Sequence, residues 1–295
     1  MLPRMVASRR VAGATVFALQ DGAGPFFQPR QQAFPDAAAH HWQQADALDP
    51  DAVDGTGGWW LRFRCFAVRL DSGRTVLVDA GIGPAGSPAA RWTPVPGRLP
   101  EELAAAGIGP DTVDTVVLTH LHTDHVGWAV THARPYFRNA RYVLQQAEFD
   151  ALAAAEPSVR ERVIRPLQDS GQLSLISGDE RIAGPLRIVA TPGHTPGHQS
   201  VLLDTGDGLV AVTGDLLVHA VQLVGPHLRY AFDADPEAAR RSRGRVLSDL
   251  HARGGLLATA HLGEPFLAAT DGGWEPGSRS WRPAEHGQPA AGQPQ

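Results

Sequence analysis

Three histidines and one aspartate fall within six residues of the stretch Thr119-His120-Leu121-His122-Thr123-Asp124-His125-Val126-Gly127. This stretch directly follows Val113–Leu118, an apolar run that predicts a buried strand. A tight loop at a strand end lets alternating side chains converge, so His120 and His122 could face one point and Asp124 and His125 a neighbouring one. Imidazole and carboxylate ligands without thiolate suit zinc, with manganese, iron or cobalt as alternatives. We therefore expect a metal site here, and the pattern favours two metals side by side.

The pattern His120-x-His122-x-Asp124-His125 resembles the signature of the metallo-β-lactamase superfamily. The resemblance covers roughly Val11 to Trp281, because four further segments are similar to the rest of the family's pattern: Val76–Gly81 with Asp79, Thr191–His198 with His194, Gly214-Asp215, and Ala260-His261. It implies that one metal is held by His120, His122 and His194. It also implies that a second is held by Asp124, His125 and His261, with Asp215 between the two ions. Asp79 would steady a ligand histidine through a hydrogen bond.

The elements that must position these groups are strands in clusters with helices between them. We expect strands at Val11–Leu19, Leu61–Leu70, Thr75–Val78, Val113–Leu118, Ala140–Leu144, Leu186–Ala190, Ser200–Leu203, Leu209–Thr213 and Gly255–Ala260. We expect helices at Glu101–Gly107, from Ala147 to about Gln168, and at Pro236–Ala252. Gly24 to Asp54 should be loop with one short helix, and Gln20-Asp21-Gly22 a turn that closes the first strand. The two halves look alike, which suits an α/β fold, a four-layer αββα metallo-β-lactamase sandwich. We expect one domain over residues 1–282 with an N-terminal extension, and a disordered tail over 283–295.

Composition limits the partners. Of 295 residues, 43% are hydrophobic and 19% charged, and the net charge is −5, which gives no reason to expect binding to nucleic acid or to a membrane surface. The single cysteine, Cys65, is expected in the core. Ser8-Arg9-Arg10 precedes an apolar run too short for an export signal, so we expect a cytoplasmic protein that acts on a small molecule. The N-terminal segment that contains Phe26 and Phe27 could pack across a homodimer interface instead of lining a substrate pocket.

The resemblance is fullest to the branch that contains N-acyl-homoserine lactonases and methyl-parathion-hydrolase-like enzymes. It implies that a hydroxide bridging two divalent metals cleaves an ester, a lactone or a phosphotriester, with Asp124 and Asp215 as catalytic residues. Some lactonases place a tyrosine three residues after the bridging aspartate, where this chain has Val218, which favours ester or organophosphate hydrolysis. The alternatives are a glyoxalase II-like thioesterase and an oxidoreductase similar to mono-iron persulfide dioxygenases.

Two histidines and one group of aromatic residues near the motifs have open roles. His198 could support a ligand or shape its turn, and His219 could protonate a leaving group. An apolar pocket beside the metals could be lined by aromatic side chains: Phe26, Phe27, Trp59, Trp60 and Trp128.

Overall fold

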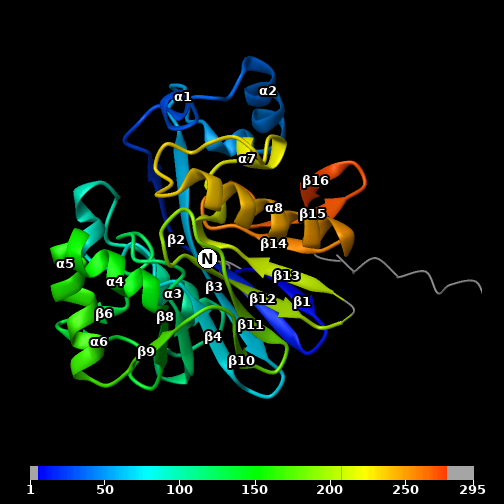
Figure 1. Cartoon of the computed structure of the whole chain (residues 1–295). Coiled ribbons are helices and arrows are strands. Elements are labelled where there is room, and N and C mark those ends of the chain that lie inside the picture. The colour runs from blue at the N-terminus through cyan, green and yellow to red at the C-terminus, as the bar shows by residue number, and fades with distance from the viewer. Residues whose placement is uncertain (1–5, 207, 278–295) are drawn as a thin grey trace, which may run out of the picture.

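The computed structural model describes residues 6–206 and 208–277, with the side chains of 152–155 left out of the description. The expected tail at 283–295 lies outside the described residues. Within them, the strands form two seven-stranded mixed sheets and one two-stranded hairpin (Figure 1). Among the described helices, none is long and apolar enough to cross a membrane.

The first sheet has the strand order β1-β2-β3-β4-β5-β8-β9. Its outer strands β1 to β4 are antiparallel neighbours, whereas β4, β5, β8 and β9 run parallel to one another. The strands are β1 (Ala7–Val11), β2 (Ala14–Pro25), β3 (Trp60–Leu70), β4 (Thr75–Val78), β5 (Thr115–Val117), β8 (Arg141–Gln145) and β9 (Leu173–Ile176); the hairpin β6 (Val130–Thr131) and β7 (Arg134–Pro135) stands apart.

The second sheet has the order β10-β11-β12-β13-β14-β15-β16, and only its β13–β14 pair is parallel. The strands are β10 (Glu180–Ala183), β11 (Leu186–Ala190), β12 (Gln199–Asp204), β13 (Leu209–Val212), β14 (Leu256–Ala258), β15 (Phe266–Thr270) and β16 (Gly273–Pro276). The two halves of the sequence look alike because each half contributes one sheet of seven strands.

Alternating side chains build the layers, because successive residues of a strand point to opposite faces. Val76 and Val78 of β4 belong to the core between the two sheets, together with Leu256 and Ala258 of β14. Leu77 faces the other way, into a core under helices α3 (Leu99–Ala105) and α6 (Arg165–Asp169). Leu257 faces a third core under α7 (Val221–Val224) and α8 (Pro236–Ala252). Helix, sheet, sheet and helix follow in that order, which confirms the predicted αββα sandwich.

The helices are α1 (Arg30–Ala33), α2 (Ala39–Leu48), α3 (Leu99–Ala105), α4 (Gln146–Ala155), α5 (Pro157–Val159), α6 (Arg165–Asp169), α7 (Val221–Val224) and α8 (Pro236–Ala252), with a π-helical turn at Arg160–Ile164. Helices α3, α4 and α6 lie beside the first sheet and α8 beside the second, whereas α1, α2 and α7 lie together at one end of the molecule (Figure 1). Helix α8 begins at an Asp235 side chain that accepts a hydrogen bond from the Ala238 nitrogen, and Pro236 occupies its first turn, so its predicted bounds are confirmed.

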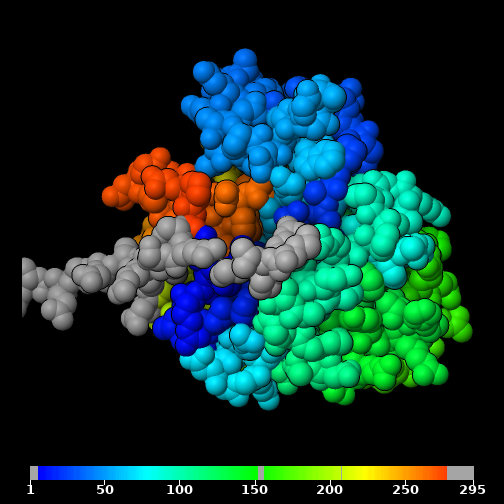
Figure 2. All heavy atoms as spheres, turned by 180° about the vertical axis from the view of Figure 1, so that it is seen from behind, coloured from blue at the N-terminus to red at the C-terminus, as the bar shows by residue number. Residues whose placement is uncertain are grey.

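Three predictions of local structure were wrong. The predicted first strand is divided by a turn into β1 and β2. Gln20-Asp21-Gly22 is a bulge inside β2 and not a turn at its end, because β2 pairs with β3 as far as Pro25. The segment from Gly24 to Asp54 holds two α-helices instead of one, and in Figure 2 it forms a lobe at the top of the molecule. The expected helix from Ala147 to Gln168 is broken at Pro157, whose ring disfavours a helical conformation at Glu156.

Candidate metal centre

Strands that run in the same direction bring the candidate ligands to one edge of the sandwich. His120, His122, Asp124 and His125 follow β5, and Asp79 follows the parallel strand β4. In the second sheet, His194 follows β11, Asp215 follows β13 and His261 follows β14. These three strands also share one direction, since β11 and β13 are each antiparallel to β12. The two sets of strand ends meet where the sheets face each other.

The first group comprises His120, His122, His194 and Asp215, whose ligand atoms all lie within 4.8 Å of one another. The Nδ1 atom of His122 lies 3.0 Å from the Nε2 atom of His120 and 3.0 Å from that of His194. Asp215 turns its Oδ2 atom toward this group, 3.3 Å from His194 Nε2.

The second group comprises Asp124, His125 and His261, and its ligand atoms also lie within 4.8 Å of one another. Here Asp215 presents its other oxygen: Oδ1 lies 2.9 Å from His261 Nε2 and 3.1 Å from His125 Nε2. One carboxylate therefore faces both groups, as a bridging ligand would. The structure brings together all of the residues that the sequence suggested as ligands, while their role as ligands stays a prediction.

The donor atoms fit a pair of cations. His125 Nε2 and Asp215 Oδ1 are buried and neither has a hydrogen-bond partner, although they lie only 3.1 Å apart. Buried polar atoms without partners are costly in a folded protein, and a bound ion would remove that cost. Burial, helped by the neighbouring His194, lowers the pKa of His122 to about 3, which keeps the imidazole neutral as a metal ligand must be. Burial opposes ionisation of Asp215, but His261 and His125 outweigh it and hold the pKa well below its ordinary value.

Each of four histidines uses its second ring nitrogen to hold its orientation. Hydrogen bonds join His125 Nδ1 to Asp79 Oδ2 (2.8 Å), His194 Nδ1 to Asp233 Oδ1 (3.3 Å), and His261 Nδ1 to the Arg62 carbonyl oxygen (2.7 Å). The Nδ1 atom of His120 lies 3.0 Å from Thr119 Oγ1. These contacts leave Nε2 of all four rings for the cation site, which is the arrangement usual for histidine ligands.

Asp79 has the position that the sequence predicted for it, next to a ligand histidine. Besides His125, it accepts hydrogen bonds from the backbone nitrogen of Thr119 at 2.7 Å and from the Thr119 hydroxyl at 2.9 Å. Its φ of 64° is a left-handed conformation that is unusual outside glycine. We attribute this conformation to the contacts that surround it, because strained residues persist where several interactions hold them.

His198 belongs to neither group of candidate ligands and contacts the backbone of Asp215. Its Nε2 atom accepts a hydrogen bond from the Asp215 backbone nitrogen at 3.1 Å, and its Nδ1 atom lies 2.8 Å from Thr191 Oγ1. Burial lowers its pKa to about 3, so the ring stays neutral and its Nε2 atom can accept.

Sequence reasoning missed Glu148, a buried carboxylate of α4. Its Oε1 accepts from the Leu121 nitrogen and its Oε2 from the Gly197 nitrogen, both at 3.0 Å. Leu121 lies between two ligand histidines, and Gly197 belongs to the loop that carries His194. A Cβ at position 197 would collide with the Glu148 backbone, so only glycine permits this approach. No local pattern separates Glu148 from the exposed Asp150 of the same helix, so only the tertiary structure reveals its contacts.

Asp21 is a second buried carboxylate that the sequence prediction placed in a turn. It accepts hydrogen bonds from the backbone nitrogens of Ile82 and Leu99, both at 2.6 Å, and from Trp128 Nε1 at 3.1 Å. Burial raises its pKa to about 6. Because Trp128 directly follows the metal-binding stretch, Asp21 connects β2 to the end of that stretch.

A pocket of about 270 Å³ opens onto both ligand groups. Phe26 and Phe27 line it as predicted, but Trp128 and Trp60 do not, and Trp59 is buried behind Phe26 with its ring centroid 4.4 Å away. The other lining residues are Trp92, Leu121, His122, Thr123, Asp124, Glu156, His194, Asp215, Tyr230 and Phe232. The pocket is therefore aromatic at its mouth and polar at its base.

His219 does not reach this pocket. It is 1% exposed and surrounded by the rings of Phe34, Trp42 and Trp59, with centroids 5.4 to 5.6 Å away. Burial lowers its pKa to about 3, so the ring is neutral near pH 7 and is a poor general acid. The suggestion that His219 protonates a leaving group was wrong.

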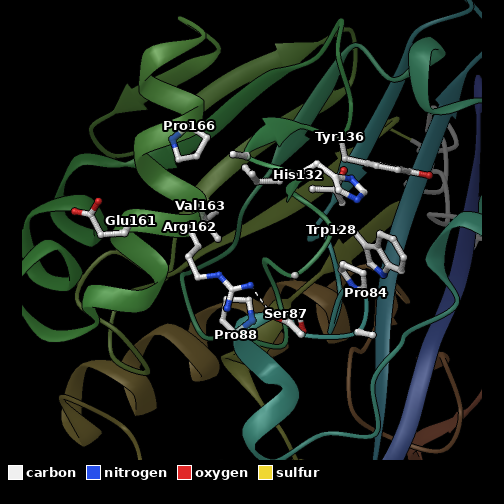
Figure 3. Close-up of a pocket in the computed structure, with 16 residues that line it drawn as sticks. Pro84, Ser87, Pro88, Trp128, His132, Tyr136, Glu161, Arg162, Val163 and Pro166 are labelled. Atoms are coloured by element: carbon white, nitrogen blue, oxygen red, sulfur yellow. Dashed lines mark hydrogen bonds between the residues drawn. The ribbon is translucent and has the colours of Figure 1, made fainter.

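A second cavity, of about 430 Å³, lies beside Trp128 and is lined by Ser87, His132, Tyr136 and Arg162 among others (Figure 3). The Ser87 hydroxyl donates to the Ile82 carbonyl oxygen, and Arg162 donates to that of Gly86, so both are engaged by the fold. The candidate ligands line the smaller pocket and not this one.

Comparison with known proteins agrees with this geometry. The family model described as the metallo-beta-lactamase superfamily matches residues 63–261. An N-acyl homoserine lactonase of Bacillus cereus is 32% identical over 119 residues, which are 40% of this chain and 44% of the relative. The N-acyl homoserine lactonase AttM of Rhizobium radiobacter is 30% identical over 117 residues, 35% of this chain and 40% of the relative. The matched stretches thus span less than half the length of these curated relatives.

Two solved structures align over nearly the whole chain. The hydrolase AbOPH of the beta lactamase superfamily is 25% identical, with a TM-score of 0.75 over 92% of this chain and 97% of that one. The dizinc quorum-quenching lactonase AidC, solved with a product, is 20% identical, with a TM-score of 0.71 over 92% and 96%. The two curated relatives and the neighbour AidC are named lactonases, so the similarity is to the lactonase-like branch. The chain belongs to the metallo-beta-lactamase superfamily.

Proposed function

We propose that this protein is a hydrolase that depends on two divalent metal ions and cleaves an ester, a lactone or a phosphotriester. The observation that carries the proposal is the single carboxylate of Asp215, which faces both donor groups at the base of an open pocket. A structural metal site is usually closed by protein ligands, whereas a catalytic one leaves a position open.

One ion would be held by His120, His122 and His194, the other by Asp124, His125 and His261, and Asp215 would bridge them. Such a pair, when bound, supplies Lewis-acid activation of the substrate and a nucleophile derived from water near neutral pH. The imidazole and carboxylate donors favour zinc, and the structural neighbour AidC is a dizinc protein. Manganese, iron and cobalt suit the same donors.

The chain's own side chains would prepare the reactants. Asp124 is buried and lines the pocket, so its carboxylate is placed to accept a hydrogen bond from the attacking water and to orient it. The backbone contacts of Glu148 and His198 would keep the ligand loops at a constant separation. Preorganised groups of this kind need no rearrangement during the reaction.

The mouth of the pocket favours a substrate with an apolar substituent. Phe27 is 63% exposed and Phe232 is 37% exposed, which is unusual for large apolar side chains. Their ring centroids lie 5.6 Å apart, and Trp92 lies 6.0 Å from Phe27. An acyl chain or aryl ring that covered these side chains would bury their apolar area and gain affinity.

The relatives named N-acyl homoserine lactonase support a lactone, but one position argues for esters or phosphotriesters. Val218 stands where some lactonases have a tyrosine, and it is 4% exposed and packed in the core under α8. The complete second donor group supports two ions, in contrast to a mono-iron oxidoreductase.

A substrate panel with metal analysis tests the proposal. Purified zinc-loaded protein is assayed on an N-acyl homoserine lactone, a p-nitrophenyl ester, an aryl thioester and a dialkyl p-nitrophenyl phosphate, and metals per chain are counted. We expect about two ions and turnover of at least one oxygen ester. Turnover of the thioester alone, or oxygen consumption with one iron, would replace the proposal by one of its alternatives.

Ligand variants test the mechanism directly. His122→Ala and Asp215→Asn should each lower turnover by more than about 100-fold, since even residues that only support ligands give 10- to 100-fold effects. His227→Ala, an exposed histidine outside the pocket, is the matched control and should keep wild-type rates. Wild-type rates in Asp215→Asn with two metals bound would contradict the mechanism.

A further inference from the structure

The metal pocket contains a tyrosine that comes from a part of the chain without any ligand. Tyr230 lies in the connection between α7 and α8 and lines the pocket together with His122, Asp124, His194 and Asp215. Its side chain is 5% exposed, and because it lines the pocket, this small exposed area faces the pocket. Of the described residues that line this pocket, Tyr230 and Thr123 are the two that carry a hydroxyl group.

The ring of Tyr230 is held in one place. It stacks on Phe34, with centroids 5.0 Å apart and planes at 27°, and it lies nearly parallel to the ligand ring of His194, at 6.0 Å and 21°. The backbone of Tyr230 is tied on both sides, because the Ala231 nitrogen donates to the Ala33 carbonyl oxygen and the Asp233 nitrogen to that of Tyr230.

Arg243 of α8 fixes the connection that carries Tyr230 to the loop that carries Asp215. Its guanidinium donates to the carbonyl oxygens of Leu228 (3.0 Å), Pro226 (3.0 Å) and Leu216 (3.3 Å). Leu216 is adjacent to the bridging aspartate. The position of the tyrosine relative to the candidate cation site is therefore set by a buried and fully engaged side chain.

The hydroxyl of Tyr230 has both its donor and its acceptor positions open to a ligand. Among the described residues it forms no hydrogen bond, while Thr123 Oγ1 accepts one from Trp92 Nε1 at 3.0 Å. His219 is enclosed by aromatic rings, and Val218 offers no polar atom. A phenol is a hydrogen-bond donor at neutral pH, because its ordinary pKa is about 10.

We infer that the Tyr230 hydroxyl donates a hydrogen bond to the substrate's C=O or P=O oxygen and stabilises the negative charge that develops there. The inference rests on the proposed hydrolase function and assigns to this chain a substrate-contacting residue outside the metal-binding motifs. Tyr230 thereby supplies a phenol that position 218 lacks.

Replacement of the hydroxyl alone tests the role. Tyr230→Phe keeps the stacking on Phe34 and His194, so the fold and the metal content should match the wild type. We expect kcat on the best substrate of the panel to fall about 10- to 100-fold, the usual effect of removing one hydrogen bond to a developing charge, with KM changed by less than about threefold. Tyr136→Phe, which removes a hydroxyl from the other cavity (Figure 3), is the matched control and should leave kcat unchanged.

A series of aryl esters with leaving groups of increasing pKa separates the possible roles. A donor to the carbonyl oxygen should give a loss in Tyr230→Phe that is the same throughout the series. A loss that grows with the leaving-group pKa would mean that Tyr230 protonates the leaving oxygen and would overturn the inference. A rise in KM with unchanged kcat would also overturn it, because it would indicate a contact made only in the ground state.

Binding gives a readout without turnover. A phosphonate monoester imitates the tetrahedral, negatively charged state, and calorimetry should show about 10-fold weaker binding to zinc-loaded Tyr230→Phe than to the wild type. Equal affinity would contradict the inference. If the wild type hydrolyses nothing in the panel, the proposed function falls and takes the inference with it. If the wild type is active and Tyr230→Phe equals it, only the inference falls.

Discussion

Replacement of Glu148 by glutamine should loosen the link between the two halves of the candidate metal centre. The two carboxylate oxygens accept from the Leu121 nitrogen, in the loop after β5, and from the Gly197 nitrogen, in the loop after β11. Glutamine has one acceptor oxygen, so its NH₂ group must face one of these two N–H donors. A hydrogen bond is lost, and a buried N–H is left without an acceptor.

The size of the effect follows from these contacts. A hydrogen bond to a charged group contributes about 1.5–3 kcal/mol, and an unsatisfied buried donor costs about 1–3 kcal/mol. Glutamine offsets part of this loss because it is neutral, and burial already raises the pKa of Glu148. We expect a net loss of about 2 kcal/mol in the free energy of unfolding, which corresponds to a decrease of about 3 °C in Tm for a chain of this size. Metal affinity should fall about 10- to 100-fold.

Calorimetry on the metal-free protein measures the first quantity, and competition with a chelator for zinc measures the second. Asp150→Asn removes a charge from an exposed position of the same helix and is the matched control, for which we expect less than about 0.5 kcal/mol. If Glu148→Gln keeps the Tm and zinc affinity of Asp150→Asn, the view that this carboxylate joins the two ligand loops is refuted.

Three further predictions concern single positions. Gly197→Ala should destabilise the protein by at least about 1–3 kcal/mol in denaturant unfolding, because its Cβ would overlap the Glu148 backbone. Gly244→Ala is the control and should be neutral or stabilising, because a Cβ there meets nothing within 4 Å. Equal effects of the two substitutions would contradict the packing argument. Because burial raises the pKa of Asp21 to about 6, the folded protein holds this proton more tightly than the unfolded chain, and the stability contributed by the group is lost as the pH rises from about 4 to 6. The difference in unfolding free energy between wild type and Asp21→Asn should therefore shrink by about 1.4 kcal/mol from pH 5 to pH 8, and a difference independent of pH would count against the buried carboxylate. Phe27→Ala should raise KM for an aryl ester several-fold without a change in Tm, because the side chain is 63% exposed, and an unchanged KM would show that the substrate does not reach the aromatic mouth.

The sequence alone was enough to predict the fold and to name the residues that the structure gathers at the candidate metal centre. The spacing of His120, His122, Asp124 and His125 after an apolar run placed them at a strand end, and the strand register of the structure agrees with that position. Asp79, His194, Asp215 and His261 were implied by the family resemblance of their segments, and in the structure each lies within four residues of the end of a strand. Strands of this kind can be predicted from the sequence because their alternating or continuous apolar residues form a local pattern that does not depend on tertiary contacts.

The aromatic pocket and the contacts that support the ligands were decided by tertiary structure. Trp128 is adjacent to the metal-binding stretch in sequence but donates to Asp21, while Trp92 and Phe232 reach the pocket from distant segments. Glu148, Asp21 and Asp233 each act on groups that lie more than 25 residues away along the chain.

A ligand motif is local, since neighbouring residues at a strand end must point to one ion. A buried carboxylate or a pocket wall is defined by whatever element packs against it, and that information is spread over the whole chain. The sequence therefore determined the chemistry available at the strand ends. Only the packing of α4, of the α7–α8 connection and of the N-terminal lobe decided which side chains orient the ligands, and whether Tyr230 or His219 faces the space above them.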